Sequence, residues 1–484
     1  MTAANTEQRL ATLFSLSKLD HAWMNLLSTS CLISAFNHVI QTARTQINRF
    51  APWLTAICAK AEFLSFLAAV VLLATLPLPQ FASDKEGLAM LAAFGIALYL
   101  FSRLATNKHV TAGAVDMLVV ATLAVNAVSA FSSHYFQASL IGLAKTAVYV
   151  LSYFWFRTTI AAYRGRSALA VSILLASGLT AALYGLYQYK TGVEPLATWE
   201  DPSIEQKATR IYSTLGNPNL LAGYLTPLAP IAIALGFAAF FKKRYVLSAI
   251  PFAVAVILSS ALVFTGSRGA YIAFFVWLTF LFVAVSLYTI KLKPMPRRYL
   301  LLPAAALVVA VPIAIHYLPS VGQRLSSIFA GSEHSSNAFR LNVWRASWRM
   351  FLDNWWLGIG PGNKTFILVY GLYMLSGFDA LGTYCVPLEV AVETGVVGLF
   401  IFGTLFLALM ARAHLVFRAA DNDFDRWLCA GCAAGLLGIM VHGLVDTVFF
   451  RPQVQFIFWL TAALIASIYN RTPNADFTSE HQKS

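Results

Sequence analysis

Four arginines, Arg210, Arg268, Arg340 and Arg451, lie in polar segments between long apolar stretches of the chain. An arginine guanidinium presents a planar fork of N–H donors that matches the oxygens of a phosphate or a carboxylate. Several such forks on one face of a protein would form a site for a multiply charged anion. A simpler alternative stays open, in which each arginine pairs with a nearby acidic residue or anchors to lipid headgroups.

Two more side chains accompany these arginines. Asn219 closes the turn that follows Arg210, and Arg345 follows Arg340 in the same predicted helix. Both supply hydrogen-bond donors for an oxygen-rich ligand. We therefore predict a substrate-binding set made of one asparagine and five arginines: Asn219, Arg210, Arg268, Arg340, Arg345 and Arg451.

Acid–base chemistry would need a carboxylate or an imidazole near those arginines. Glu389 and Glu393 have the spacing that puts them on one face of a predicted helix, and so do His442 and Asp446. Glu389 and His442 are candidates for catalysis, although a histidine that only bonds a neighbour fits the pattern as well. The sequence contains no metal-ligand cluster, P-loop or Rossmann glycine motif, so we expect no metal and no cofactor.

The composition indicates a protein embedded in a membrane. Of the 484 residues, 58% are hydrophobic and only 11% are charged, and the mean hydropathy is +0.68. Soluble domains contain about 25% charged residues. The formal net charge of +13 suits basic loops beside anionic lipid headgroups, not nucleic acid, because the charges fall in short clusters between apolar runs. We predict an all-α, polytopic membrane helix bundle.

Apolar runs of the length that spans a bilayer, about 20 residues, recur along the chain. We predict about twelve transmembrane helices, at residues 61–79, 87–106, 110–130, 139–158, 168–187, 219–240, 246–264, 269–290, 299–318, 387–410, 427–448 and 453–470.

Basic residues fall in every second connection between these spans, for example at 242–244 and 291–298. Cytoplasmic loops are enriched in Lys and Arg, so these connections and both termini are predicted to be cytoplasmic. The chain is then a multi-pass protein of the cytoplasmic (inner) membrane, with membrane lipids as partners. The four arginines fall on the opposite, outer side.

Three regions follow from this topology. Residues 1–60 are predicted to form a cytoplasmic or interfacial segment, residues 61–470 the transmembrane domain, and residues 471–484 a disordered cytoplasmic tail. Within the domain, residues 319–386 form a large outer loop.

This outer loop is predicted to carry a helix that lies at the membrane surface. Asn337 can cap a helix that begins at the next residue. An apolar face then follows at helical spacing, with two tryptophans of the kind that settle at a membrane interface: Leu341, Trp344, Trp348 and Phe351.

Two charged residues, Asp116 and Lys145, fall inside predicted spans. Ionisable groups within the membrane are costly and usually face a partner or a cavity. The sequence leaves open whether these two pair with each other or line a path.

Several of these segments resemble the O-antigen ligase/polymerase superfamily of bacterial envelopes, and the resemblance covers roughly residues 50–470. The segments are Arg210–Asn219, Thr265–Gly269, Arg340–Trp344, Leu357–Gly362 and Glu393–Gly398. Within the superfamily, three further segments are most similar to a chiefly cyanobacterial branch named for bicarbonate (inorganic carbon) transport: Gly362–Phe366, Tyr384–Glu389 and His442–Gln453.

The resemblance implies a metal-independent membrane glycosyltransferase that moves a glycan from a lipid pyrophosphate carrier to an acceptor outside the cytoplasmic membrane. It assigns pyrophosphate binding to Arg210 and Arg268. The catalytic histidine of the ligases lies just before the Glu393–Gly398 segment, at the place where this chain has Tyr384. Tyr384 therefore joins Glu389 and His442 as a catalytic candidate by its position. A tyrosine, with an unperturbed pKa near 10, is a poor base at neutral pH, so Tyr384 departs from the ligase pattern, and Glu389 or His442 would have to take the place of the histidine.

Two functions therefore compete. In the first, the chain binds a polyprenyl-pyrophosphate-linked glycan on the outer face of the membrane, as a glycan ligase or transferase. In the second, it is a bicarbonate (inorganic carbon) transporter or an accessory to uptake. The number of arginine forks favours the first function, because a small monoanion needs fewer forks and also needs a polar path to the cytoplasm.

Overall fold

The computed structural model describes residues 52–78, 85–103, 113–193, 210–294 and 335–472, besides three isolated residues at 41, 42 and 45. In this part of the chain the regular elements are helices. In order they are α4 (Pro52–Thr75), α6 (Lys85–Arg103), α7 (Ala114–Ser132), α8 (Phe136–Phe156), η1 (Arg157–Ala161), α9 (Arg164–Thr191), η2 (Ser213–Leu215), α10 (Pro218–Phe240), α11 (Tyr245–Phe264), α12 (Arg268–Leu287), η3 (Tyr288–Leu292), α15 (Ser335–Asp353), α16 (Asn363–Tyr370), α17 (Val386–Ala419), α18 (Asp423–His442), η5 (Val448–Phe450) and α19 (Pro452–Asn470).

Nine helices in the described ranges are long and apolar enough to cross a membrane. A helix satisfies its own backbone hydrogen bonds, which an apolar bilayer demands. The nine coincide with nine of the predicted spans, so the prediction of a polytopic helical membrane protein is confirmed. The predicted spans at 61–79 and 87–106 correspond to α4 and α6, which are helical but are not among the nine. The span predicted at 299–318 lies outside the described residues.

The centre of the bundle is formed by α10, α18 and α19, whose residues are mostly buried. Small residues bring α10 and α18 together. A Cβ at Gly431 or Gly435 of α18 would press against the backbone of Pro230 or Pro227 in α10. Glycines at a membrane helix interface allow such close approach.

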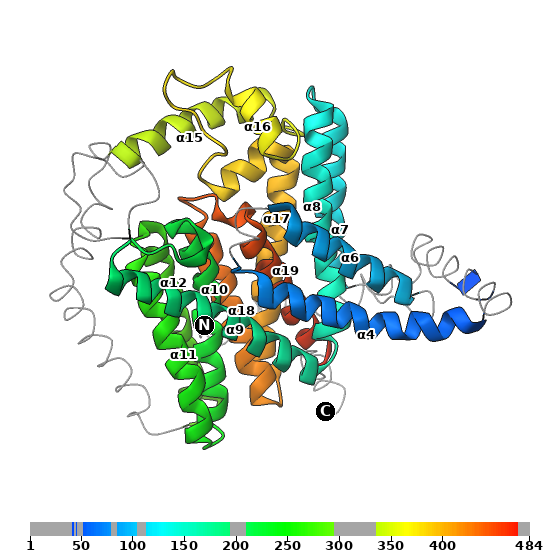
Figure 1. Ribbon diagram of the computed structural model, residues 1–484, viewed down its shortest axis with the longest axis vertical. Helices are drawn as coiled ribbons and strands as arrows, with labels where there is room; N and C mark the ends of the chain where they lie inside the picture. The colour runs from blue at the N-terminus through cyan, green and yellow to red at the C-terminus, as the bar shows by residue number, and fades with distance from the viewer. Residues whose placement is uncertain are drawn as a thin grey trace, which may run out of the picture.

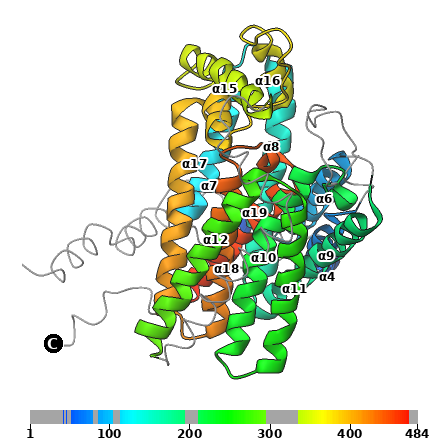
Figure 2. The ribbon, with the colours of Figure 1, turned by 90° about the vertical axis from the view of Figure 1, so that its left-hand side faces the viewer.

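The two ends of the bundle differ in what they carry. Helices α15 and α16 lie across one end, called the capped end below (Figure 1 and Figure 2). At the opposite end, basic residues of the interhelical turns contact the start of α18: Arg164 contacts Asp425 at 2.7 Å, and Lys293 contacts Asp423 at 3.0 Å. The basic turns therefore gather at one end, as their alternation along the chain predicts.

Helix α17 is broken near its first third, at Gly395, whose φ is +68°. Backbone groups of the segment that follows α15 replace the missing helical bonds. Ile359 N–H donates to the Val392 carbonyl at 2.9 Å, and Val396 N–H donates to the Trp355 carbonyl at 2.8 Å. The break is therefore satisfied by protein backbone, as irregular structure within a membrane protein requires.

Helix α15 is the helix predicted in the outer loop, but it is already helical at Ser335. Asn337 thus lies inside the helix, and the prediction that it is the N-cap is wrong. The predicted apolar face is divided, because Trp348 is 53% exposed whereas Phe351 packs against the protein. The side that packs onto the protein carries Val343 and Met350, which cluster with Val392 of α17.

One predicted region boundary lies inside a helix. Helix α4 begins at Pro52, so the boundary predicted at residue 60 falls inside it. The predicted N-terminal segment before Pro52 and the tail after Thr472 otherwise lie outside the described residues, apart from the isolated positions given above.

Helix α18 is shorter than predicted, because it ends at His442 and not at residue 448. The Gly443 carbonyl instead accepts a hydrogen bond of 2.6 Å from Val386 N–H at the start of α17. The prediction that His442 and Asp446 share one helix face is therefore wrong, since Asp446 lies in the turn beyond the helix.

Candidate functional site

A chain of side-chain hydrogen bonds joins three connections at the capped end. Arg210 Nε donates to the Thr265 carbonyl at 2.9 Å, and Arg210 Nη2 donates to Asn219 Oδ1 at 2.8 Å. Asn219 Nδ2 in turn donates to Asp446 Oδ2 at 2.8 Å. Because a guanidinium only donates and a carboxylate only accepts, the Asn219 amide can lie in one orientation alone.

The local sequence explains the position of Asn219. The Asn217 side chain caps α10 by accepting from the backbone N–H groups of Asn219 and Leu220, at 2.8 and 3.1 Å. Pro218 occupies the first turn, where its missing N–H has no cost. Asn219 is thereby held at the start of α10, with its side chain between Arg210 and Asp446.

The interfacial helix reaches the same point through Arg340. Its guanidinium lies 3.8 Å from Asp446 Oδ2. Arg451, which precedes α19, lies within electrostatic range of Tyr384 and Glu389. We call this group the arginine cluster and define it as Arg210, Asn219, Arg340, Asp446 and Arg451, with Arg268 at the start of α12 beside it.

The structure therefore brings together most of the predicted substrate-binding set. Arg345 is different, because it is exposed on α15 and makes no contact with the cluster among the described residues. The alternative that arginines pair with local acids is realised in part, since Asp446 is an ion-pair partner of Arg340. One carboxylate among these arginines leaves the charge balance of the cluster positive.

Tyr384 lies within electrostatic range of Asp446, Arg340 and Arg451 and has an unusual backbone conformation, with φ of +54°. Its ring makes an edge-to-face contact with Phe339 of α15, at 5.6 Å between centroids. Burial raises the pKa of the Tyr384 phenol above 10, and the Asp446 carboxylate raises it further, against the opposing effect of Arg340 and Arg451. The phenol is therefore a hydrogen-bond donor at neutral pH, not a base.

His442, at the end of α18, is almost wholly buried. Its Nε2 is 3.3 Å from the Oγ of Ser267, which is the residue before Arg268. Its Nδ1 has no hydrogen-bond partner among the described residues. The contact holds the end of α18 against the start of α12, and a catalytic role for His442 stays a prediction.

The two glutamates of α17 have different surroundings. Glu389 Oε2 accepts from the backbone N–H and the hydroxyl of Thr383, at 3.1 and 3.3 Å, so its carboxylate holds the segment before α17. Glu393 Oε1 accepts from Gly362 N–H at 2.8 Å, and Glu393 also lines a cavity. Of the two, Glu393 is the carboxylate beside open space.

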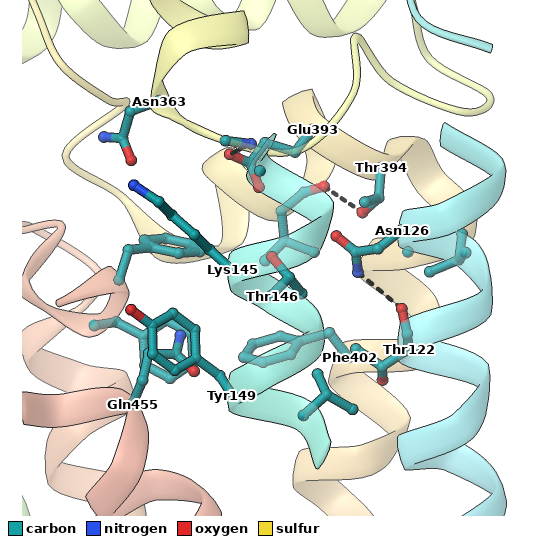
Figure 3. Close-up of a pocket in the computed structure, with 18 of the residues that line it drawn as sticks. Thr122, Asn126, Lys145, Thr146, Tyr149, Asn363, Glu393, Thr394, Phe402 and Gln455 are labelled. Atoms are coloured by element: carbon teal, nitrogen blue, oxygen red, sulfur yellow. Dashed lines mark hydrogen bonds between the residues drawn. The ribbon is translucent and has the colours of Figure 1, made fainter. Parts of the chain in front are cut away.

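This cavity, about 180 Å³ in volume, lies among α7, α8, α17 and α19 (Figure 3). Lys145, Tyr149 and Gln455 are among the residues that line it. The intramembrane charges Asp116 and Lys145 therefore do not pair. Asp116 forms an ion pair with Arg157 and accepts from the Tyr153 hydroxyl at 2.7 Å, whereas Lys145 faces the cavity.

The sequence alone does not reveal the link that Asp446 makes between Arg340 and Asn219. One signal was available, because Gly443 directly follows His442, and glycine at this position often ends a helix. The pairing partners were not predictable, since they come from turns far apart in the chain. Among the residues that the structure describes, no group of three His, Cys, Asp or Glu side chains could hold a metal ion.

The comparison with protein families gives one result that bears on this site. The family model described as O-antigen ligase matches residues 253–403, a segment that contains Arg268, Arg340, Tyr384 and both glutamates of α17. No curated protein matches the chain. The chain is thus a multi-pass helical membrane protein with an O-antigen ligase-like segment at residues 253–403.

Proposed function

We propose that this protein binds a polyprenyl-pyrophosphate-linked glycan at the capped end of its bundle and transfers the glycan to an acceptor, as a metal-independent glycan ligase. In this proposal the capped end faces outward from the cytoplasmic (inner) membrane, and both termini are cytoplasmic. The observation that carries the proposal is the connected chain from Arg210 through Asn219 and Asp446 to Arg340.

These connected hydrogen bonds support anion binding because they fix the guanidiniums of Arg210 and Arg340 before any ligand arrives. Donors that are already oriented stabilise a developing negative charge without the cost of reorganisation. A pyrophosphate offers several charged oxygens to the positive cluster. The exposed Trp348 of α15 suits a helix beside lipid, which is where a polyprenyl tail would lie.

The reaction places clear demands on the site. The acceptor hydroxyl oxygen forms a bond to the first sugar carbon, while the bond from that carbon to the pyrophosphate oxygen breaks. The electron pair leaves with the pyrophosphate, whose charge the arginines hold. The hydroxyl proton must go to a base, and Glu393 beside the cavity is better placed to take it than Glu389 or His442, which are enclosed.

Arginine-to-lysine substitutions test the proposal, because lysine keeps the charge but loses the fork. We expect Arg210→Lys and Arg268→Lys to weaken the binding of a polyprenyl pyrophosphate at least about tenfold, which corresponds to about 1.4 kcal/mol. Arg345→Lys is the matched control, since Arg345 is exposed and outside the cluster. Binding would be measured with purified protein in nanodiscs.

Bicarbonate transport is the competing function, and the same preparations separate the two. In liposomes, labelled bicarbonate flux and lipid-pyrophosphate binding are measured side by side. Saturable flux that disappears in Arg268→Ala, without any lipid-pyrophosphate binding, would overturn the glycan proposal. Binding without flux is the result that we expect.

A further inference from the structure

The cavity of Figure 3 is lined by polar groups that keep hydrogen-bonding capacity beyond their bonds within the fold. Lys145 extends into it from α8, near Asn363. No acidic side chain of the described ranges pairs with Lys145. A lysine inside a spanning helix costs about 2.5–3.5 kcal/mol on insertion scales, so such a residue usually serves a ligand or a water-filled space.

Two buried amides at the cavity have fixed orientations. The indole N–H of Trp459 donates to Gln455 Oε1 at 2.9 Å, which turns the Gln455 NH₂ group away from Trp459. Asn126 Nδ2 donates to the Thr122 carbonyl at 2.8 Å, which leaves its Oδ1 free. Both side chains line the cavity and are only 7% and 8% exposed. The cavity thus has one oriented donor and one oriented acceptor.

Further hydrogen-bonding groups surround these two. The hydroxyls of Thr146 and Tyr149 have no hydrogen-bond partner in the described part of the chain. Glu393 accepts from Gly362 N–H through Oε1, so its Oε2 is available to accept from an occupant of the cavity. Thr146 and Tyr149 are half-buried in a wall that would lie within the membrane, so this set favours an occupant that supplies both donors and acceptors.

Aromatic side chains form the rest of the wall, among them Phe402, Phe449 and Trp459. A phosphate or a metal ion would gain little from contact with such rings. The presence of both Lys145 and Glu393 also argues against a highly charged occupant, because their formal charges balance. A neutral ring that carries hydroxyl groups matches an apolar wall with a few placed polar groups.

We propose that this cavity binds a single neutral sugar ring. The proposal rests on the proposed function, because it gives the glycan substrate a place beside the pyrophosphate site. The volume of about 180 Å³ is below the roughly 300 Å³ at which pockets for drug-sized ligands begin, so it admits one ring and not a chain of them.

The cavity lies next to the arginine cluster. Arg451 directly follows Phe449 and Phe450 in the cavity wall, and its charge acts both on Tyr149 in the cavity and on Tyr384 near the cluster. Glu393 in the cavity wall is one helical turn from Glu389, which also feels Arg451. A sugar in the cavity would therefore lie beside a pyrophosphate in the cluster.

The test uses methyl glycosides of glucose, galactose, mannose and N-acetylglucosamine as probes of the full-length protein in nanodiscs. Saturation-transfer NMR would measure their binding. We expect at least one glycoside to bind with a Kd on the order of 1–10 mM. We expect Thr146→Phe, which fills the cavity, and Gln455→Leu, which removes the donor, each to weaken this binding at least tenfold.

Two controls accompany these variants. Thr158→Val lies on the same run of helix but outside the cavity, and should leave glycoside binding unchanged. Arg268→Ala should reduce lipid-pyrophosphate binding and leave glycoside binding intact. If Thr146→Phe fails to fold, as judged by gel filtration, Asn126→Leu replaces it.

Three results would overturn the sugar site. These are no saturable glycoside binding at about 50 mM, binding that Thr146→Phe and Gln455→Leu leave unchanged, and binding of inorganic phosphate that requires Lys145 in place of glycoside binding. Lipid-pyrophosphate binding by the same samples keeps the two proposals apart. Lipid binding without glycoside binding removes the sugar site alone, and the reverse result removes the proposed function alone.

Discussion

Tyr384 has a left-handed backbone conformation, with φ of +54°, that bulky residues rarely adopt. Such a conformation costs on the order of 1–3 kcal/mol and persists where the surroundings enforce it, often at functional sites. Here the surroundings are Phe339 of α15 and the buried Thr383–Glu389 contact on either side. This conformation keeps the phenol within electrostatic range of Asp446, Arg340 and Arg451, where the proposed function would use it as a donor to a phosphate oxygen.

The raised pKa of Tyr384 gives a prediction about pH. Its folded pKa lies above 10 because burial disfavours the phenolate. The folded state therefore holds this proton more tightly than the unfolded state, and the resulting stability is present below pH 10 and lost as pH rises through the folded pKa. Spectrophotometric titration of the protein and of Tyr384→Phe should differ by one ionisation above pH 10.

An ionisation of Tyr384 near neutrality would contradict this assignment and would make the phenol a candidate base after all. Activity, if measured, should accordingly show no step near neutral pH that Tyr384→Phe removes. The control is Tyr384→His, which introduces a group that titrates near pH 6.5 and should add such a step.

At the scale of elements, the broken helix α17 and the glycine-rich segment before α16 depend on each other. Gly395 has φ of +68°, and a Cβ there would overlap the Trp356 carbonyl. We expect Gly395→Ala to destabilise the protein by at least about 2 kcal/mol, from left-handed strain and the overlap together. The thermal midpoint in detergent would fall, and proteases would cut the Trp355–Gly362 segment faster.

Gly403 provides the matched control on the same helix. A Cβ at Gly403 meets nothing within 4 Å, and the residue is helical. Gly403→Ala should leave stability unchanged or raise it by about 0.5–1 kcal/mol, because alanine favours a helix interior. Equal effects of the two substitutions would contradict the role given to the break.

Helix existence was largely predictable from the sequence, whereas helix ends and partners were not. Apolar runs of spanning length located nine spans, because the bilayer sets their length and composition. The end of α18 was misplaced, since its apolar pattern continues past Gly443 while the backbone turns toward Val386. Likewise, Asn337 has the side chain of an N-cap, yet α15 already includes Ser335.

The candidate site was predictable as a set of residue types but not as a geometry. Arg210, Arg340 and Arg451 were predictable as candidates because basic residues in these polar turns break the alternation of charge. Nothing in the spacing shows that Asn219 bridges Arg210 to Asp446, because that contact joins residues 227 positions apart. The cavity at Lys145 was likewise not visible, since its wall combines four helices.

At the scale of the whole molecule, the separation of the two ends predicts how the protein sits in its membrane. The end with Lys242–Arg244 and the Arg164–Asp425 contact should face the cytoplasm, because basic residues concentrate there. In a cysteine-free background, an impermeant thiol reagent added to intact spheroplasts should label Lys364→Cys and spare Lys243→Cys. Both positions are exposed.

Permeabilised cells should label both positions, which shows that each cysteine is reactive. Labelling of Lys243→Cys in intact spheroplasts would reverse the orientation. The arginine cluster would then face the cytoplasm, and a ligand on the outer leaflet could not reach it.

The burial of α19 has a consequence for how the protein is made. Nearly every residue of α19 is buried, and it contacts α8, α17 and α18. The ribosome makes α19 after every other helix that the structure describes, yet its place is at the centre of the bundle. Until α19 inserts, the helices made before it therefore leave its place in the bundle unfilled. Polar groups beside that place, such as Lys145, then contact lipid or a membrane chaperone.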